Sequence, residues 1–315
     1  MEDKVANVSM VLRLGTRGSK LARAQTKIVV DALKRIHPAL VINEVIIRTE
    51  GDVDKVSPLS EIGGRGVFTA ALEAALRIGS IDVAVHSAKD LPTADPPDLA
   101  LIAFLAREDP RDVFVSRCGG DLDSLPLNPT IGTSSRRREA EMLVARPDAR
   151  IVPLRGNVDT RLRKARAGVG GLDGIVLAAA GLIRLGWSEA ITSYLSVERF
   201  VPSPGQGALA LQTRSNDRAT IDLISPLNEP PVSTAVNVER AFLRAAGGGC
   251  TAPIGAYAQV RDGAFFLHAL IGAEDGHEVV CRGIELPTDK IAAEDAATEL
   301  AREMVESINP TRHEA

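Results

Sequence analysis

With 315 residues, 45% of them hydrophobic, the chain is long enough for two or three domains with cores of their own and needs no disulfide or metal to hold its fold. Its formal net charge of −4 at pH 7 disfavours nucleic acids and anionic membranes as partners. An aromatic content of only 3% also argues against the stacking surfaces that bind single-stranded nucleic acid.

Strand and helix signals alternate along the first part of the chain. Helical periodicity begins at Ser19, and His37-Pro38 ends it. In this part we expect strands at 11–15, 41–48 and 81–85 and helices at 19–36 and 68–78. Strands that alternate with helices predict a parallel-type α/β sheet with ligand-binding loops at the strand ends.

The alternation resumes after Pro110 and changes character near residue 230. In the middle part we expect strands at 113–116, 130–132, 150–154, 173–178 and 208–213, helices at 135–145 and 158–167, and a loop at 202–207. In the last part we expect a helix at 232–246, a hairpin of 254–260 and 264–271 around Asp262-Gly263, a strand at 278–283 and a helix at 291–308. Strands in a run with flanking helices indicate a small α+β domain.

Arginine is strongly favoured over lysine, because only 8 of the 37 basic residues are Lys and the other 29 are Arg. Guanidinium groups bind carboxylate or phosphate in a bidentate fork. High-GC coding also favours Arg, so only the positions of the arginines can distinguish anion binding from coding bias. The most unusual position is Arg136–Arg138, directly after Thr133-Ser134-Ser135. Serines are good N-caps but helix N-termini disfavour cations, so this segment is either an anion site or a solvated basic face.

Two more segments repeat this order of strand, arginine and helix start. Thr16-Arg17-Gly18-Ser19 follows the first expected strand, and Arg155-Gly156-Asn157 follows another, with Arg161 one turn further on. Three such corners around one cleft would bind a ligand with several carboxylates. Recognition of phosphate would have the same signature, so these segments alone leave both open.

Two further segments carry side chains that could take part in a reaction. Asp90 follows a buried strand, and an acid crowded by cations can stabilise a developing positive charge, although a turn carboxylate bonded to backbone amides is the plain alternative. Cys250 follows three glycines, so its sulfur could be a nucleophile or an attachment point, although most such cysteines are inert. His86 is expected to be a packed histidine rather than a base.

The remaining motifs restrict cofactor and compartment. The glycine-rich segment 57–68 is expected to be a mobile lid, and its spacing is not that of a phosphate-binding loop. The three cysteines, Cys118, Cys250 and Cys281, form no CxxC pair and no zinc-ligand spacing, which favours a reducing cytoplasm and no metal. No apolar signal segment opens the chain, and no stretch reaches the ~20 apolar residues of a membrane span.

Nine motifs follow one another over most of the chain. They are LGTRGSKLARAQ (14–25), GGRGVFT (63–69), DVAVHSAKDLP (82–92), REDPRDVFVS (107–116), IGTSSRRREA (131–140), LRGNVDTRL (154–162), AAAGLIRLG (178–186), PGQGAL (204–209) and GGGCTAPIGA (247–256). In this order and spacing they resemble the porphobilinogen deaminase (hydroxymethylbilane synthase) family.

The resemblance implies an α/β fold with two type II periplasmic-binding-protein-like domains and a small α+β C-terminal domain that contains a three-stranded sheet. The implied boundaries are 1–105 with 206–226 for the first domain, 106–205 for the second and 227–315 for the third. A monomer is the implied state, with a small-molecule substrate and neither nucleic acid nor membrane as partner.

The resemblance also implies a transferase of tetrapyrrole (haem) biosynthesis. Such an enzyme condenses four porphobilinogen units with loss of ammonia and hydrolyses the product to linear hydroxymethylbilane. Asp90 is implied to stabilise the azafulvene cation that loss of ammonia creates. The implied cofactor is a dipyrromethane held by a thioether to Cys250, with Ser19, Lys89, Asp90, Thr133, Ser135, Arg137, Arg138 and Arg155 around it. The implied substrate-binding residues are Arg17, Gln25, Arg155, Arg161, Arg184 and Gln206.

Two alternatives belong to other classes of protein. A non-catalytic solute-binding module for a polycarboxylate anion would share the cleft but would need neither Asp90 nor Cys250, and it would normally carry a secretion signal. A nucleic-acid-binding regulator could use Arg136–Arg138, but the acidic balance and the lack of a helix-turn-helix segment disfavour it.

Overall fold

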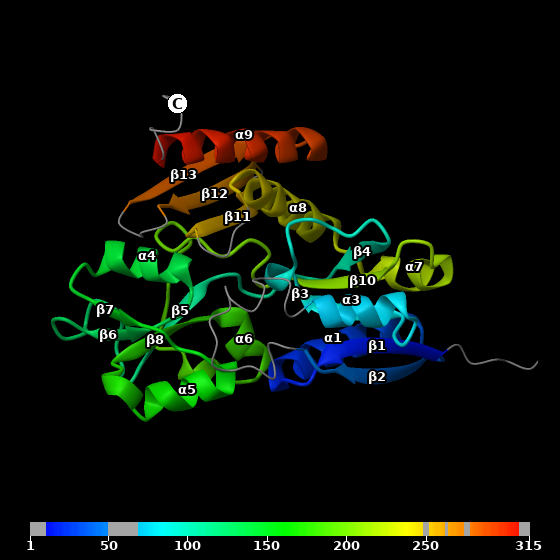
Figure 1. The fold of residues 1–315 in the computed structure, drawn as a ribbon, viewed down its shortest axis with the longest axis horizontal. Coiled ribbons are helices and arrows are strands. Elements are labelled where there is room, and N and C mark those ends of the chain that lie inside the picture. The colour runs from blue at the N-terminus through cyan, green and yellow to red at the C-terminus, as the bar shows by residue number, and fades with distance from the viewer. Residues whose placement is uncertain (1–10, 50–68, 248–251, 262–263, 274–277, 309–315) are drawn as a thin grey trace, which may run out of the picture.

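The structure, a computed structural model, describes residues 11–49, 69–247, 252–261, 264–273 and 278–308. Its strands form two five-stranded sheets and one three-stranded sheet. In Figure 1 the three-stranded sheet and its helices lie above both five-stranded sheets, which are side by side below. This arrangement confirms the expected α/β class with a smaller α+β unit at the C-terminal end.

The first sheet has the strand order β2-β1-β3-β10-β4. Its strands are β1 (Val11–Arg17), β2 (Val41–Ile47), β3 (Val83–Ser87), β4 (Leu99–Phe104) and β10 (Leu209–Arg214). The helices of this unit are α1 (Lys20–Ile36), α3 (Ala70–Arg77) and α7 (Arg218–Ile224), with short 3₁₀ turns η2 (Ala88–Asp90) and η5 (Ser225–Leu227).

The second sheet has the order β7-β6-β8-β5-β9. Its strands are β5 (Asp112–Ser116), β6 (Thr130–Gly132), β7 (Arg150–Val152), β8 (Gly174–Ala178) and β9 (Ser193–Tyr194). The helices are α4 (Arg136–Ala145), α5 (Val158–Arg166) and α6 (Ala179–Arg184), with 3₁₀ turns η3 (Val169–Gly171) and η4 (Ser188–Ala190). The sequence patterns did not predict β4, β9, α6 or α7.

The expectation of parallel-type sheets is wrong for part of each sheet. β1 pairs in parallel with β2 and β3, but β10 runs antiparallel to both of its neighbours, β3 and β4. In the second sheet β5 is antiparallel to β8 and β9. A buried strand is apolar on both faces whatever its direction, so hydrophobic runs reveal its existence but not its orientation.

The third sheet is an antiparallel meander of β11 (Ile254–Arg261), β12 (Ala264–Gly272) and β13 (Val279–Leu286). Helices α8 (Pro230–Ala245) and α9 (Lys290–Ile308) cover one face of it. Phe242, Leu267 and Met304 are fully buried in the core between them. The hairpin and the closing helix expected from the sequence are therefore confirmed.

Local sequence and packing agree in α1, the helix that borders the candidate site. The Ser19 hydroxyl accepts a hydrogen bond from the Ala22 amide at 3.2 Å and so caps the helix. Val29 and Leu33 are fully buried against Leu12 and Leu14 of β1, and each such side chain stabilises the fold by roughly 1.5–3 kcal/mol. The cap and this apolar stripe together fix where Arg17 and Ser19 emerge.

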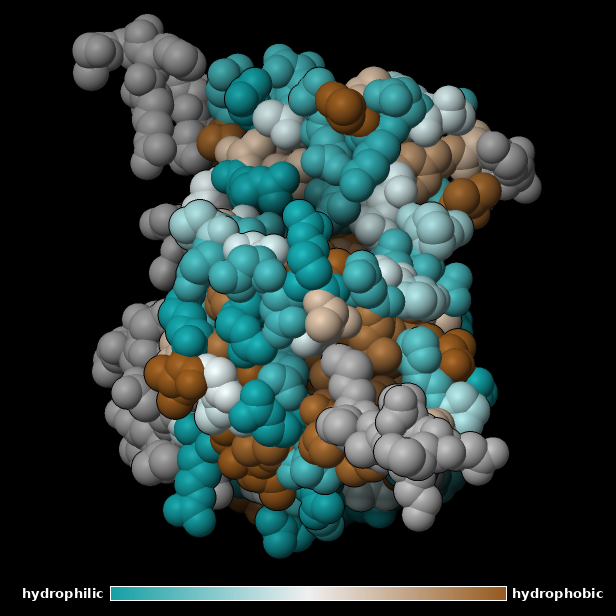
Figure 2. Space-filling view, turned by 90° about the vertical axis from the view of Figure 1, so that its right-hand side faces the viewer, coloured by the Kyte–Doolittle hydropathy of each residue, from teal (hydrophilic) through white to brown (hydrophobic). Residues whose placement is uncertain are grey.

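The surface gives no sign of a membrane-spanning segment in the part of the chain that the structure describes, where no helix is both long and apolar enough to cross a bilayer. Figure 2 shows one side of the molecule, on which hydrophilic residues dominate the upper half and hydrophobic residues gather lower down.

The chain returns from the second sheet to the first through Gly205–Gly207, where the backbone is tightly enclosed. Gly207 has φ +89°, and a Cβ at this position would collide with the carbonyl oxygen of Glu108. We expect Gly207→Ala to lower the free energy of unfolding by about 2 kcal/mol, through the strained φ and the backbone clash together. Urea denaturation measures this change.

Gly79 provides the matched control for this substitution. Its φ is +68°, but no atom lies within 4 Å of the position of an added Cβ. Gly79→Ala therefore reports the cost of positive φ alone. Equal losses in the two variants would contradict the close approach of residues 207 and 108.

Candidate active site

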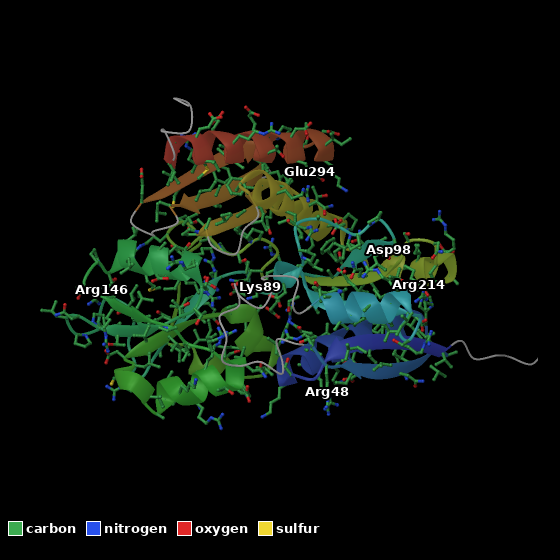
Figure 3. The ribbon with its side chains drawn as sticks, viewed as in Figure 1. Arg48, Lys89, Asp98, Arg146, Arg214 and Glu294 are labelled. Carbon is green, nitrogen blue, oxygen red and sulfur yellow. The ribbon has the colours of Figure 1, made fainter. Side chains whose placement is uncertain are left out.

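A cleft lies between the two five-stranded sheets. Two adjoining pockets of about 440 and 520 Å³ share Leu21, Gln25 and Ser87, so they form one continuous cleft. Lys89 lies at its centre, between the two units (Figure 3). The predicted site residues that line the cleft are Arg17, Ser19, Gln25, Lys89, Asp90, Arg138, Arg161, Arg184 and Gln206.

The cleft is strongly electropositive. Among its described lining residues Asp90 is the one carboxylate, and five side chains are cationic: Arg17, Lys89, Arg138, Arg161 and Arg184. Burial, with a further contribution from Arg138, lowers the pKa of Lys89 to about 8. Burial likewise lowers the pKa of Arg161 to about 10 and that of Arg184 to about 10. Crowded cations of this kind favour a ligand with several negative charges.

The three strand-to-helix segments that carry arginine contribute to the cleft in different ways. Arg17 and Ser19, at the start of α1, line the cleft directly. Ser135 caps α4 and accepts a hydrogen bond from the Arg138 amide at 3.4 Å. Arg161 lines the cleft from α5 and donates from Nε to the Gly156 carbonyl at 2.7 Å.

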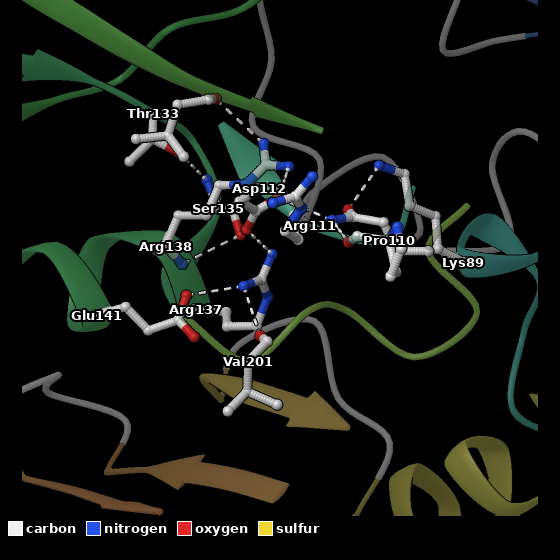
Figure 4. Close-up of polar contacts among 12 residues, drawn as sticks. Lys89, Pro110, Arg111, Asp112, Thr133, Ser135, Arg137, Arg138, Glu141 and Val201 are labelled. Carbon is white, nitrogen blue, oxygen red and sulfur yellow. Dashed lines mark hydrogen bonds and ion pairs between the residues drawn. The ribbon is translucent and has the colours of Figure 1, made fainter. Parts of the chain in front are cut away.

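The anion expected at the start of α4 is supplied by the chain itself, as Figure 4 shows. The fully buried carboxylate of Asp112 accepts from Arg137 Nη2 at 2.6 Å and from Arg138 Nη2 at 2.7 Å. Burial alone would raise the pKa of Asp112, but the two guanidinium groups outweigh it and hold that pKa well below its usual range. A solvated basic face is therefore wrong for Arg137 and Arg138, which are 5% and 7% exposed.

Arg137 is engaged entirely within the protein. Besides Asp112 it contacts Glu141 Oε2 at 2.7 Å and donates to the Val201 carbonyl at 2.7 Å. Thr133 is also buried, and its hydroxyl accepts from the Ser135 amide at 3.2 Å. Among the described residues, the predicted Thr133, Ser135, Arg137 and Arg155 do not line the two pockets.

Two guanidinium nitrogens nevertheless lack a partner inside the described structure. Arg138 Nε and Arg155 Nη1 are buried and make no hydrogen bond. A buried unsatisfied donor costs roughly 1–3 kcal/mol, so such atoms are typical of a binding site that a ligand completes. Their chemistry fits the carboxylate groups of an acidic ligand.

Gln206 and Gln25 have different environments within the cleft. Gln206 is 1% exposed; its Oε1 accepts from Lys89 Nζ at 3.1 Å, and its Nε2 donates to Pro110 O at 2.7 Å and Asp112 Oδ1 at 2.8 Å. Gln25 donates to the Ser87 hydroxyl at 2.8 Å.

His86 has the packed role expected for it. Its ring is 4% exposed and lies 3.0 Å from Gln212 Oε1. Burial lowers the pKa of His86 to about 4, so the ring is neutral at physiological pH. Cys250 and the expected lid at 57–68 lie outside the described residues.

Two acidic residues with large roles were missed by the sequence analysis. Asp112 balances the arginines of α4, and the fully buried Glu239 accepts from Arg107 at 2.6 and 3.1 Å, from the Gly205 amide at 2.6 Å and from the Ala258 amide at 2.8 Å. Arg107 and Gly205 lie in the two segments that connect the larger sheets to each other, and Ala258 lies in β11. Glu239 thus links both connecting segments to the third sheet. The one available signal was that buried arginines require carboxylate counter-ions somewhere in the chain.

Comparison with protein families matches nearly the whole chain. Residues 12–222 match the family model described as "Porphobilinogen deaminase, dipyromethane cofactor binding domain". Residues 233–306 match the one described as "Porphobilinogen deaminase, C-terminal domain". The chain belongs to the porphobilinogen deaminase family.

Curated porphobilinogen deaminases include several close relatives. The protein of Roseiflexus castenholzii is 46% identical over 268 residues, which cover 85% of this chain and 88% of the relative. That of Shouchella clausii is 47% identical over 272 residues, 86% and 87% of the two chains. That of Syntrophus aciditrophicus is 41% identical over 295 residues, 94% and 95%.

Comparison with solved structures finds lower similarity to this porphobilinogen deaminase family member. The BenM effector-binding domain with benzoate has a TM-score of 0.40 at 18% identity, covering 71% of this chain and 97% of that domain. The Salmonella typhimurium periplasmic binding protein STM4351 has a TM-score of 0.38 at 12% identity, covering 71% and 94%.

Proposed function

We propose that this chain catalyses the hydroxymethylbilane synthase reaction, the stepwise condensation of four porphobilinogen units followed by hydrolysis to the linear tetrapyrrole. In each condensation the carbon–nitrogen bond of the aminomethyl group breaks and ammonia leaves. The remaining methylene carbon forms a carbon–carbon bond to a ring carbon of the neighbouring pyrrole, and that ring carbon releases its hydrogen as a proton. The observation that carries the proposal is a family match over 12–222 and 233–306 combined with a cleft that is lined by five cations and by Asp90.

The cations suit the substrate because porphobilinogen carries acetate and propionate arms, and a growing chain accumulates carboxylates. We assign the binding of substrate arms to Arg17, Gln25, Arg155, Arg161 and Arg184. For binding of the dipyrromethane we assign Ser19, Lys89, Arg138 and Arg155. Thr133, Ser135 and Arg137 do not line the two pockets, and we assign them the role of holding these residues in place. The free Arg138 Nε and Arg155 Nη1 support this assignment.

Attachment of the dipyrromethane to Cys250 by a thioether is part of the same proposal. When bound, this group supplies the pyrrole carbon to which the first substrate unit is joined. The match of residues 12–222 to a cofactor-binding domain supports a dipyrromethane in this family member. The other cysteines of the chain, Cys118 and Cys281, are free and exposed.

Asp90 is assigned the catalytic role. Departure of ammonia leaves a positive charge on the substrate. Asp90 is the one carboxylate among the described residues that line the cleft, and it stabilises that charge where it develops. Asp90 also acts on its neighbours, because its charge raises the pKa values of Lys89 and Arg161 against the effect of burial.

The sheets suggest how the chain is divided. We propose a first domain of 1–105 with 206–226, a second of 106–205 and a third of 227–315, in a monomeric cytoplasmic enzyme. The position of β10 inside the first sheet supports the return of the chain to the first domain.

The intact mass of the purified protein, followed by peptide mapping around Cys250, tests this function. We expect an adduct of two linked pyrrole units on Cys250, and its loss in Cys250→Ser. Cys118→Ser and Cys281→Ser are matched controls that should keep the adduct. A wild-type chain that acquires no adduct even after incubation with porphobilinogen would instead support a binding module.

A further inference from the structure

Gln206 is the residue of the cleft whose contacts fit a role other than ligand binding. Its amide has two N–H donors, and both are used inside the protein, on Pro110 O and Asp112 Oδ1. Binding of a carboxylate requires a donor, so Gln206 cannot hold a substrate arm without breaking one of these bonds. With 1% of its surface exposed, it also presents little to a ligand.

The orientation of the amide is determined by its surroundings. Pro110 O and the Asp112 carboxylate can only accept, so the NH₂ group must face them. The carbonyl oxygen then points to the opposite side, where it accepts from Lys89 Nζ at 3.1 Å. The side chain therefore spans from Lys89, in the 3₁₀ turn that also contains Asp90, to the carboxylate that holds Arg138.

We propose that Gln206 is a positioning residue, which fixes the Lys89 ammonium relative to the Asp112–Arg138 pair across the junction of the two larger units. This inference rests on the proposed function for its effect on turnover. The positioning itself is a property of the chain without substrate. It replaces the expectation that Gln206 contacts the substrate.

Gln206 Oε1 accepts a hydrogen bond from the Lys89 ammonium, whose charged neighbours act on its pKa in opposite directions. Arg138 and Arg137 lower its pKa, whereas Asp90 and Asp112 raise it. Arg161 and Arg184 add positive charge to the same pocket. With burial already unfavourable to the ammonium, removal of the Gln206 oxygen takes away an acceptor that stabilises the charged form, so the pKa of Lys89 falls further.

The test uses Gln206→Met, which preserves length and removes both polar ends. Lys89 is labelled with acetic anhydride across a range of pH, in the protein as purified, and quantified by peptide mass spectrometry against the exposed Lys34. If the pKa falls from about 8 by about one unit, the unprotonated and reactive fraction of Lys89 at pH 7 rises about fivefold. The alkaline limb of kcat/KM should move to lower pH by the same amount.

Gln259→Met is the matched control, because Gln259 also makes a side-chain contact, to His268, but lies in the third sheet. It should leave the labelling of Lys89 and the pH profile unchanged. Gln206→Asn keeps an amide but is one methylene shorter, so it should change the labelling of Lys89 in the same direction. Gln206→Asn therefore tests the positioning role if Gln206→Met does not fold.

The outcomes separate the two proposals. Unchanged Lys89 labelling in a folded Gln206 variant overturns the positioning role, and a raised KM with unchanged labelling would return Gln206 to direct substrate contact. Altered labelling in a chain that makes no hydroxymethylbilane would instead sustain the positioning role and defeat the proposed function.

Discussion

Asp90→Asn should reduce kcat for hydroxymethylbilane formation by about 100-fold or more while leaving the fold intact. Asn has the same shape but no charge, so the cation formed when ammonia leaves would meet a cleft in which every charged group among the described lining residues is positive. Removal of one preorganised group that stabilises transition-state charge typically costs about 10²–10³ in rate. Single-turnover assays with porphobilinogen measure the loss.

Asp95→Asn provides the control for this variant. Asp95 lies five residues further along the chain and pairs at 2.6 Å with Arg240 of α8, outside the cleft. Its substitution should leave kcat within about threefold of the wild type, because neither Asp95 nor Arg240 is among the residues that line the cleft. Near-normal kcat in Asp90→Asn would show that the carboxylate has no part in stabilising the cation.

Glu239→Gln should produce the largest loss of stability of the changes considered. Its carboxylate is fully buried and receives two bonds from Arg107 and two from backbone amides. Loss of its charge leaves Arg107, only 11% exposed, without a counter-ion, and breaking a buried pair in this way costs about 3–5 kcal/mol. The midpoint of urea unfolding, followed by circular dichroism, measures the change.

The exposed pair of Arg282 and Glu303 is the corresponding control. Its side chains are 42% and 55% exposed, so Glu303→Gln should change the free energy of unfolding by less than about 1 kcal/mol. If Glu239→Gln lowered the free energy of unfolding no more than Glu303→Gln does, the Glu239 carboxylate would not be what holds the connecting segments against the third sheet.

Local signals in the sequence predicted much of the fold but few of the side-chain contacts within the site. Ser19 and Ser135 mark the starts of α1 and α4 because a cap acts within one helical turn. The partner of Arg137 and Arg138 could not be predicted in this way, since Asp112 lies 25 and 26 residues away from them in the chain. Long-range pairs are fixed by topology rather than by local pattern.

The same distinction applies to Gln206. It lies in the motif PGQGAL (204–209), and the family resemblance implies a substrate contact for it. Only the folded chain brings Pro110, Asp112 and Lys89, from 96, 94 and 117 residues away, to the two ends of one amide. Its donors are then already occupied.

The place of β10 has a consequence for how the protein is made. β10 lies between β3 and β4, which are separated from it by more than 100 residues of chain that form the whole second sheet. During synthesis on a ribosome the N-terminal sheet therefore lacks an interior strand until the second unit has emerged. Contacts so distant along the chain fold slowly, and the incomplete sheet exposes unpaired edges in the meantime. We expect the unit of the first sheet to complete only after the second unit, which interrupts it in the chain.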